Sequence, residues 1–321
     1  MSIVADNNAS DTLVIPWLDG FDLGPVPGGP KVVAIGGGHG LAVMLQAARR
    51  YAGSITAIVS VADDGGSSGR LRAMHDVPAP GDLRKALGAL ASEGSVWPDV
   101  LEHRFQGGDL DGHTVGNVLL VGLAESLGSI CAACSEASRM VSAVGAIYPA
   151  TTDAAQLEAQ VGDNTISGQV AIQQAGALGR IRNVRVLPDG LAASQGALAA
   201  IMEADQIVLG PGSLFTSLVA SVVVPEIRTA IALAAARVIQ VANAQTEAPE
   251  TLGLDGTDHL LAVLEHRVRV DTFLYDRQAA LGVNEAYVFE HGVMPVGADL
   301  GAAIGITYDP DQLAKALSDL L

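Results

Sequence analysis

The chain has 321 residues and a formal net charge of −17, and 49% of its residues are hydrophobic while only 4% are aromatic. This length suits one large α/β domain or two small ones, with a core built from aliphatic residues. The negative charge excludes the basic surface with which proteins hold nucleic acid.

The sequence contains no run of about 20 apolar residues, so no transmembrane helix is expected. Its first Lys or Arg is Lys31, and the N-terminus therefore lacks the positive region of a signal peptide. We expect a cytoplasmic protein with no membrane insertion.

Residues 1–30 are predicted to be a flexible N-terminal tail, because they end in the Gly/Pro-rich stretch GPVPGGP. The fold is expected to begin at Lys31. From there the chain reads as strand, glycine turn, helix and strand, in the segments KVVAI, GGGHG, LAVMLQAARRY and SITAIVSVA. This succession opens a doubly wound sheet, and residues 31–321 are predicted to form one nucleotide-binding domain.

The middle of the chain is expected to be helical, in GDLRKALGALAS, VWPDVLEHRF, TVGNVLLVGLAESL and SICAACSEASRMVSAV. Cys131 and Cys134 in the last segment are interpreted as two small buried residues on one helix rather than a redox pair. Residues 147–188 instead hold short alternating segments, and they predict a small antiparallel insertion made of IYPATT, QLEAQVGD, GQVAIQQ and RIRNVRVLP.

Strands and helices alternate again after the insertion. Strands are predicted at DQIVLG, RVIQVAN and VDTFLYD, and helices at residues 194–203, TDHLLAVLEHR and PDQLAKALSDLL. The apolar stretch 221–236 fits either a core helix or a face of a homo-oligomer, and the core interpretation is preferred. The predicted fold class is α/β: a Rossmann-like, doubly wound, mostly parallel sheet with a small antiparallel insertion. Such a sheet binds ligands at its switch point, outside the carboxyl ends of the strands.

Glycine-rich or polar turns follow the predicted strands. Gly36–Gly40 (GGGHG) follow the first strand, Gly210–Ser213 (GPGS) follow DQIVL, and Asn243 ends RVIQVAN. Bare N–H groups in such turns can approach an oxyanion, and a following helix N-terminus adds positive potential. GGGHG departs from the dinucleotide fingerprint, because Leu41 stands where the third glycine belongs. Each turn alone is either a phosphate cradle or a simple tight turn.

The stretch Asp63–Arg70 reads DDGGSSGR and has three interpretations. Its two carboxylates could bind ribose hydroxyls, coordinate Mg²⁺ beside a phosphate, or belong to a solvated turn or cap. Three glycines make this loop costly to order, which favours a ligand-binding role. Arg70 and Arg72 could pair with phosphates or form surface ion pairs.

Two further clusters carry polar side chains. Asp82 in PGDLRKAL is interpreted as a helix N-cap. His113 and Asn117 in HTVGN share one helix face at i, i+4 spacing. They either point into the ligand cleft or bond locally.

The order and spacing of these motifs resemble the gluconeogenesis factor family of the YvcK type, relatives of 2-phospho-L-lactate transferase in the CofD-like superfamily. The motifs concerned are GGGHGL, VSVADDGGSSGRLR, PAPGDLRKAL, HTVGNVLL, VLGPGSLFTSLV and VANAQTEAPET, between about Lys31 and Asp276. The resemblance implies a bound UDP-sugar or a dinucleotide such as NAD. It also implies a regulatory role in cell shape and cell-envelope synthesis during gluconeogenic growth, with a protein partner in that synthesis.

Carried onto this chain, the resemblance implies that the nucleotide is bound by Gly36, Gly37, Gly38, Asp63, Asp64, Gly65, Gly66, Ser67, Ser68, His113, Asn117, Gly210, Pro211, Gly212, Ser213, Thr216 and Asn243. It assigns no catalytic residue and no resident metal ligand. His39 stands where the family usually has Thr, and TEAPET is one residue shorter than usual.

Three functions are compared. No Ser–His–Asp or Cys–His arrangement is evident, which favours a nucleotide-binding regulator without turnover. The alternative is an enzyme like 2-phospho-L-lactate transferase, with a nucleotide donor and Mg²⁺ held by Asp63 and Asp64. Five Phe, five Tyr and two Trp leave little aromatic surface for a flavin-like acceptor. The broken fingerprint counts against an NAD-dependent dehydrogenase.

Overall fold

The structure, a computed structural model, describes residues 24–302 and 307–321. Most of the predicted tail therefore lies outside the described residues. Residues 24–30 pack against the connection between the first two strands, where the Val26 N–H donates to the Ala52 carbonyl at 2.8 Å.

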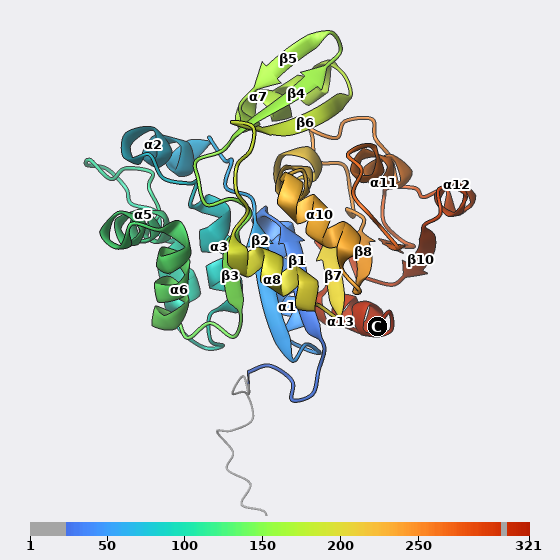
Figure 1. The fold of residues 1–321 in the computed structure, drawn as a ribbon, viewed down its shortest axis with the longest axis horizontal. Coiled ribbons are helices and arrows are strands. Elements are labelled where there is room, and N and C mark those ends of the chain that lie inside the picture. The colour runs from blue at the N-terminus through green and yellow to red at the C-terminus, as the bar shows by residue number, and fades with distance from the viewer. Residues whose placement is uncertain (1–23, 303–306) are drawn as a thin grey trace, which may run out of the picture.

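Within the described residues, seven parallel strands form one sheet in the order β10-β9-β8-β7-β1-β2-β3 (Figure 1). They are β1 Lys31–Gly36, β2 Ser54–Val59, β3 Ala146–Pro149, β7 Gln206–Leu209, β8 Arg237–Val241, β9 Thr272–Asp276 and β10 Met294–Ala298. The chain runs outward from β1 to β3, returns to the other side of β1 as β7, and continues outward to β10. The switch point of this doubly wound sheet therefore lies between β1 and β7, and the predicted fold class is confirmed.

Helices cover both faces of the sheet. One face packs against α1 Gly38–Ala48, α3 Gly81–Leu90, α4 Trp97–Glu102, α5 Val115–Leu127, α6 Ile130–Met140 and α13 Pro310–Ser318, and the other against α8 Gln195–Glu203, α10 Pro225–Leu233, α11 Gly256–Glu265 and α12 Glu285–Glu290. Successive side chains of β1 pack on opposite faces of the sheet, since Val32 lies in one hydrophobic core and Val33 in the other. This double burial explains the near-continuous apolar strands.

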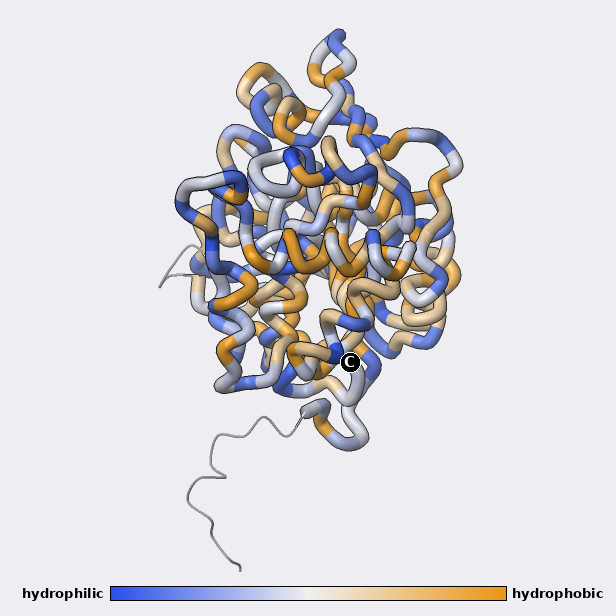
Figure 2. The backbone as a smooth tube through the Cα atoms, turned by 90° about the vertical axis from the view of Figure 1, so that its left-hand side faces the viewer, coloured by the Kyte–Doolittle hydropathy of each residue, from blue (hydrophilic) through white to orange (hydrophobic). Residues whose placement is uncertain are grey.

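The antiparallel insertion lies above the main sheet in Figure 1. Its sheet has the order β5-β4-β6, with β4 Gln156–Val161, β5 Asn164–Ser167 and β6 Ile181–Leu187. β3 pairs with β2 in the main sheet, so the insertion begins later than the predicted residue 147. Figure 2 shows hydrophilic residues at the tip of the insertion, where β5 is largely exposed.

Two segments differ from their predicted conformation. GQVAIQQ was predicted as a strand but forms the helix α7 Gln169–Ala175, which leads into the 3₁₀ turn η1 Gly176–Leu178. The second half of DDGGSSGR was predicted as a loop but opens α2 Gly66–His75. Both helices depend on partners distant in sequence, which the local residue pattern does not reveal.

The apolar stretch around residue 221 forms core helices, as preferred. It comprises the π-helix η2 Leu214–Val219, α9 Ala220–Val222 and α10, and its side chains are mostly buried. Among the described residues, no single helix is long and apolar enough to cross a membrane, and only one pair of helices, bent by 72°, meets that test together.

The N-terminus of α1 touches the turn after β7 without any side chain between them. A Cβ placed on Gly40 would lie 2.3 Å from the Pro211 carbonyl oxygen. We expect Gly40→Ala to lower the free energy of unfolding by about 1–3 kcal/mol, because backbone cannot yield as a side chain does. Gly122→Ala is the matched control, since no atom from outside the neighbouring helix backbone lies within 4 Å of that Cβ. It should raise the free energy of unfolding by up to about 1 kcal/mol through helix propensity. Urea denaturation measures both, and equal effects would contradict the close approach.

Candidate functional site

A cleft of about 470 Å³ opens at the switch point of the sheet. Its walls come from the turns after β1, β2, β7 and β8, from α3 and from α7. Among the predicted nucleotide-binding residues, those that line the cleft are Gly38, Asp63, Gly65, Pro211, Gly212, Ser213 and Asn243. The other predicted residues lie beside or behind these walls.

The N-terminus of α1 presents backbone N–H groups to the cleft. Gly38, His39 and Gly40 all line it. Gly37 is the N-cap of α1 and provides no side-chain hydrogen bond, and the first intrahelical donor is the N–H of Leu41. An uncapped helix start carries positive potential and suits an anion such as a phosphate.

The GPGS turn is predicted to be a second anion site, but several N–H groups in and after it already have protein partners. The Gly212 N–H donates to Asn243 Oδ1 at 3.1 Å, and Asn243 Nδ2 donates back to the Gly212 carbonyl at 2.9 Å. The N–H groups of Phe215 and Thr216 donate to Glu250 Oε1 at 3.0 and 2.8 Å. Asn243 and Glu250 thus occupy the N–H groups of Gly212, Phe215 and Thr216, so the start of α1 is the better anion site.

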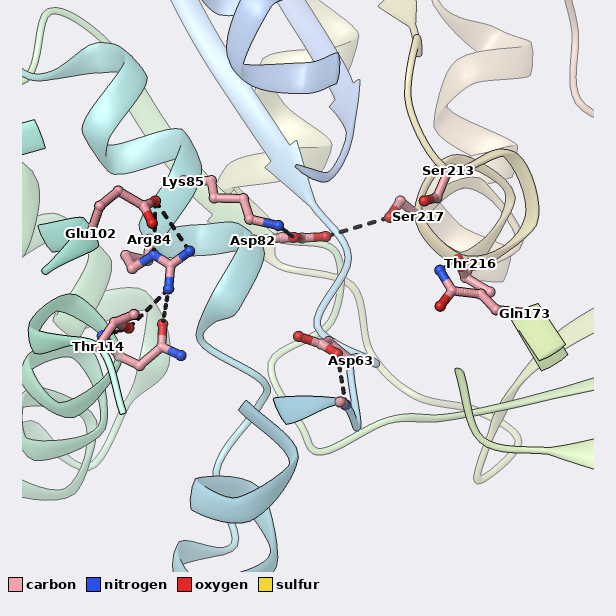
Figure 3. Close-up of polar contacts among 12 residues, drawn as sticks. Asp63, Asp82, Arg84, Lys85, Glu102, Thr114, Gln173, Ser213, Thr216 and Ser217 are labelled. Carbon is pink, nitrogen blue, oxygen red and sulfur yellow. Dashed lines mark hydrogen bonds and ion pairs between the residues drawn. The ribbon is translucent and has the colours of Figure 1, made fainter. Parts of the chain in front are cut away.

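Two carboxylates face one another across the cleft floor. Asp63 accepts a hydrogen bond from the Gly65 N–H at 2.9 Å. Asp82 accepts from Lys85 Nζ at 3.2 Å and from Ser217 Oγ at 3.4 Å (Figure 3). Burial raises the pKa of Asp63, and the negative charge of Asp82 adds to this rise. Asp82 is not the predicted N-cap of α3, because that position belongs to Pro80.

Asp64 faces away from this floor, although it adjoins Asp63. Its carboxylate accepts from the N–H groups of Gln169 and Val170, both at 3.0 Å. Asp64 therefore binds the first turn of α7, where it satisfies donors that the helix itself cannot. This long-range contact explains why GQVAIQQ becomes helical.

A buried polar network supports the DDGGSSGR stretch from behind. Ser67 Oγ lies 3.0 Å from His113 Nδ1 and accepts from Asn117 Nδ2 at 3.0 Å. Arg84 Nη1 donates to Thr114 Oγ1 at 2.8 Å and to Asn117 Oδ1 at 3.3 Å. His113 and Asn117 therefore fix α2 and α5 together instead of pointing into the cleft.

The imidazole of His113 is held in its neutral form. Burial lowers its pKa first, and the charges of Arg70 and Arg104 lower it further. A neutral ring can share a hydrogen with the Ser67 hydroxyl, which suits a structural role.

Several cleft residues were missed from the sequence. They are His39, Lys85, Gln169, Val170, Gln173 and Glu247, together with Asp82, which was interpreted only as a cap. Asp82 and Lys85 stand in a motif that was singled out, so a signal existed. Gln169 and Gln173 gave none, because their segment was read as a strand.

Comparison with known proteins identifies the family. The family model described as 2-phospho-L-lactate transferase CofD matches residues 32–306. The chain belongs to the CofD family. Within it, the gluconeogenesis factor of Bacillus subtilis (strain 168) is 34% identical over 299 residues, 91% of this chain and 93% of that protein. The gluconeogenesis factor of Halalkalibacterium halodurans is 41% identical over 238 residues, 74% and 73% of the two chains. These relatives confirm the predicted gluconeogenesis factor type.

A solved structure supports the same family assignment. The crystal structure of a UPF0052 family member from Bacillus halodurans is 34% identical and superposes with a TM-score of 0.85, covering 89% of this chain and 97% of that one.

Glu250 should make the stability of this CofD-family protein depend on pH. Burial, and then the charge of Glu247, raise the pKa of Glu250 from 4.5 to about 7. Because folding favours the protonated acid, its stabilisation is complete below about pH 4.5 and is lost as pH rises through 7. Glu250→Gln keeps an oxygen acceptor for Phe215 and Thr216 but cannot titrate.

Between pH 5 and 8, the wild type should therefore lose up to about 3 kcal/mol of unfolding free energy that Glu250→Gln retains. Urea denaturation at three pH values measures this difference. Parallel pH profiles for the two proteins would contradict the assignment.

Proposed function

We propose that this chain binds a nucleotide, either a UDP-sugar or a dinucleotide such as NAD, in the cleft at the switch point and acts as a regulator without efficient turnover. The observation that carries the proposal is the uncapped N-terminus of α1, which faces this cleft at the carboxyl end of β1. Helix starts in this position bind phosphate groups in doubly wound folds.

The net charge of −17 opposes any anionic ligand, so local geometry must hold a diphosphate. Lys85 lines the cleft and supplies one cation. Asp63 and Asp82, with the Ser217 hydroxyl close by, offer the hard oxygen donors that Mg²⁺ prefers. Burial, and then the negative charge of Asp82, raise the pKa of Asp63, and a divalent cation bound between the two carboxylates would relieve their repulsion. Bound there, Mg²⁺ would neutralise charge on the diphosphate.

The names of the relatives support the proposed regulatory role. Relatives of this chain bear the name gluconeogenesis factor. We extend this to a cytoplasmic role in cell shape and cell-envelope synthesis during gluconeogenic growth, exerted through a protein partner.

The alternative function is an enzyme like 2-phospho-L-lactate transferase. The description of the matching family model favours it, and so does the Asp63–Asp82 pair. The cleft lining argues against a flavin-like acceptor, because in the described residues Tyr308 is its only Phe, Tyr or Trp. Its hydroxyl donates to the Ala242 carbonyl at 2.6 Å and the residue is buried, which leaves little ring surface for stacking.

Asp63→Asn should weaken nucleotide binding about 5- to 150-fold, because the proposed Mg²⁺ would lose a charged ligand, a loss of roughly 1–3 kcal/mol. Isothermal titration with UDP-glucose and with NAD, each with Mg²⁺, measures this loss. Asp109→Asn is the control, because Asp109 is exposed and does not line the cleft. Binding by Asp63→Asn at wild-type strength would overturn the placement of the ligand.

The bound nucleotide should be recovered unchanged after long incubation with the protein and Mg²⁺. Mass spectrometry of the ligand measures this, with and without a phospho-lactate nucleotide donor and a flavin acceptor. We expect the ligand to raise the melting temperature by linkage to the folded state. Multiple turnovers in any of these mixtures would contradict the regulator hypothesis and favour the transferase hypothesis.

A further inference from the structure

The helix α7 forms the wall of the cleft that is contributed by the antiparallel insertion. Ile172 and Ala175 point into the core, while Gln169, Val170 and Gln173 line the cleft. Residues 169 and 173 are one helical turn apart, so their side chains share a face. The insertion thus presents two primary amides and one aliphatic side chain to any ligand in the cleft.

The chemistry of this wall differs from that of the wall opposite. The sheet side supplies charge and backbone N–H groups, through the start of α1, Lys85, Asp63 and Asp82. α7 contributes no charge. Each glutamine amide offers a donor and an acceptor together, which matches uncharged polar groups such as heterocycle carbonyls, ring amides and hydroxyls.

The glutamines are partly fixed and partly available. Gln173 Nε2 donates to Thr216 Oγ1 at 3.1 Å, which anchors the side chain to η2 beside the cleft (Figure 3). Across residues 24–302 and 307–321, neither Oε1 of Gln173 nor the side-chain amide of Gln169 has a protein hydrogen-bond partner. A pre-oriented amide with an open acceptor loses little side-chain entropy when it binds a ligand.

Asp64 holds this wall against the DDGGSSGR stretch. Asp64 is exposed, but besides its two hydrogen bonds to Gln169 and Val170 its carboxylate lies so close to the chain that a Cβ on Gly168 would lie 2.5 Å from Asp64 Oδ2. A Cβ on Gly65 would lie 3.2 Å from Val170 Cγ2. Two charge-assisted hydrogen bonds from adjacent N–H groups to Asp64 fix both the position and the orientation of the first turn of α7.

We infer that α7 is the recognition wall for the uncharged part of the nucleotide, its base or its sugar, and that Asp64 is the positioning residue that sets this wall. The inference rests on the proposed function and adds which part of the ligand each wall binds. The diphosphate is assigned to the sheet side and the uncharged moiety to the insertion.

The test is isothermal titration of the double variant Gln169→Leu/Gln173→Leu with UDP-glucose, UDP and pyrophosphate, each with Mg²⁺. Leucine keeps the side-chain volume near that of glutamine and removes both amides. We expect UDP-glucose affinity to fall about ten-fold or more and pyrophosphate affinity to change less than about two-fold. A similar loss for UDP would place the base on α7, and a loss confined to UDP-glucose would place the sugar there. Gln174→Leu, on the exposed face of α7, is the control and should bind all three as the wild type does.

Asp64→Asn tests the positioning role, with circular dichroism confirming that the variant is folded. Like the double glutamine variant, it should lose more affinity for UDP-glucose than for pyrophosphate. Asp63→Asn should weaken both ligands together.

Two results would overturn the inference: wild-type UDP-glucose affinity in the double variant, or an equal loss for pyrophosphate, which would mean that α7 only supports the fold. If the wild type itself bound neither UDP-glucose nor NAD, the proposed function and the inference would both be overturned, whereas either of the first two results would overturn the inference alone.

Discussion

The site depends on one constraint, the close approach of backbone segments at the switch point. A Cβ on Gly40 would lie 2.3 Å from the Pro211 carbonyl oxygen, and one on Gly37 would lie 2.2 Å from Asp82 Oδ2. A Cβ on Gly81 would lie 2.4 Å from Ser68 Oγ. Bare backbone at these positions lets α1, α2, α3 and the turn after β7 meet around one cleft. These glycines therefore serve first to bring the walls together, and any contact with a phosphate follows from that packing.

Acidic side chains accept hydrogen bonds from the backbone N–H groups at two helix starts near the cleft. Asp64 occupies the N–H groups at the start of α7, and Glu250 occupies those at the start of η2. The start of α1 has no side-chain cap. In a chain of net charge −17, this distribution makes the start of α1 a better place for an anion than the starts of α7 and η2. The GPGS turn, which looks like a phosphate cradle in sequence, is instead fixed by Asn243 and Glu250.

The sequence predicts those parts of the fold that local pattern determines. Apolar strands followed by glycine turns identified the parallel sheet and its switch point, because each strand is buried on both faces. α2 and α7 were missed because distant residues stabilise them: Ser67 bonds to Asn117, and Asp64 caps a helix more than 100 residues later. Asp82 resembles a cap locally, and only the tertiary fold brings it to Ser217. The spacing of the motifs nevertheless identified the CofD family from sequence.

The adjacent pair Asp63 and Asp64 explains the unusual composition of the stretch that contains them. Although the two residues are adjacent, the carboxylate of Asp63 reaches the cleft floor while that of Asp64 reaches α7. The peptide bond between Asp63 and Asp64 thus joins the charged, sheet-side wall of the cleft to the uncharged wall formed by α7. A nucleotide that contacts both walls, as proposed, must match the separation that this unit sets. The glycines and serines that follow allow the chain to turn directly into α2, whose Ser67 is fixed by His113 and Asn117. The loop is therefore rigid where the two walls meet, and a ligand that fits both walls gains affinity without having to order the loop.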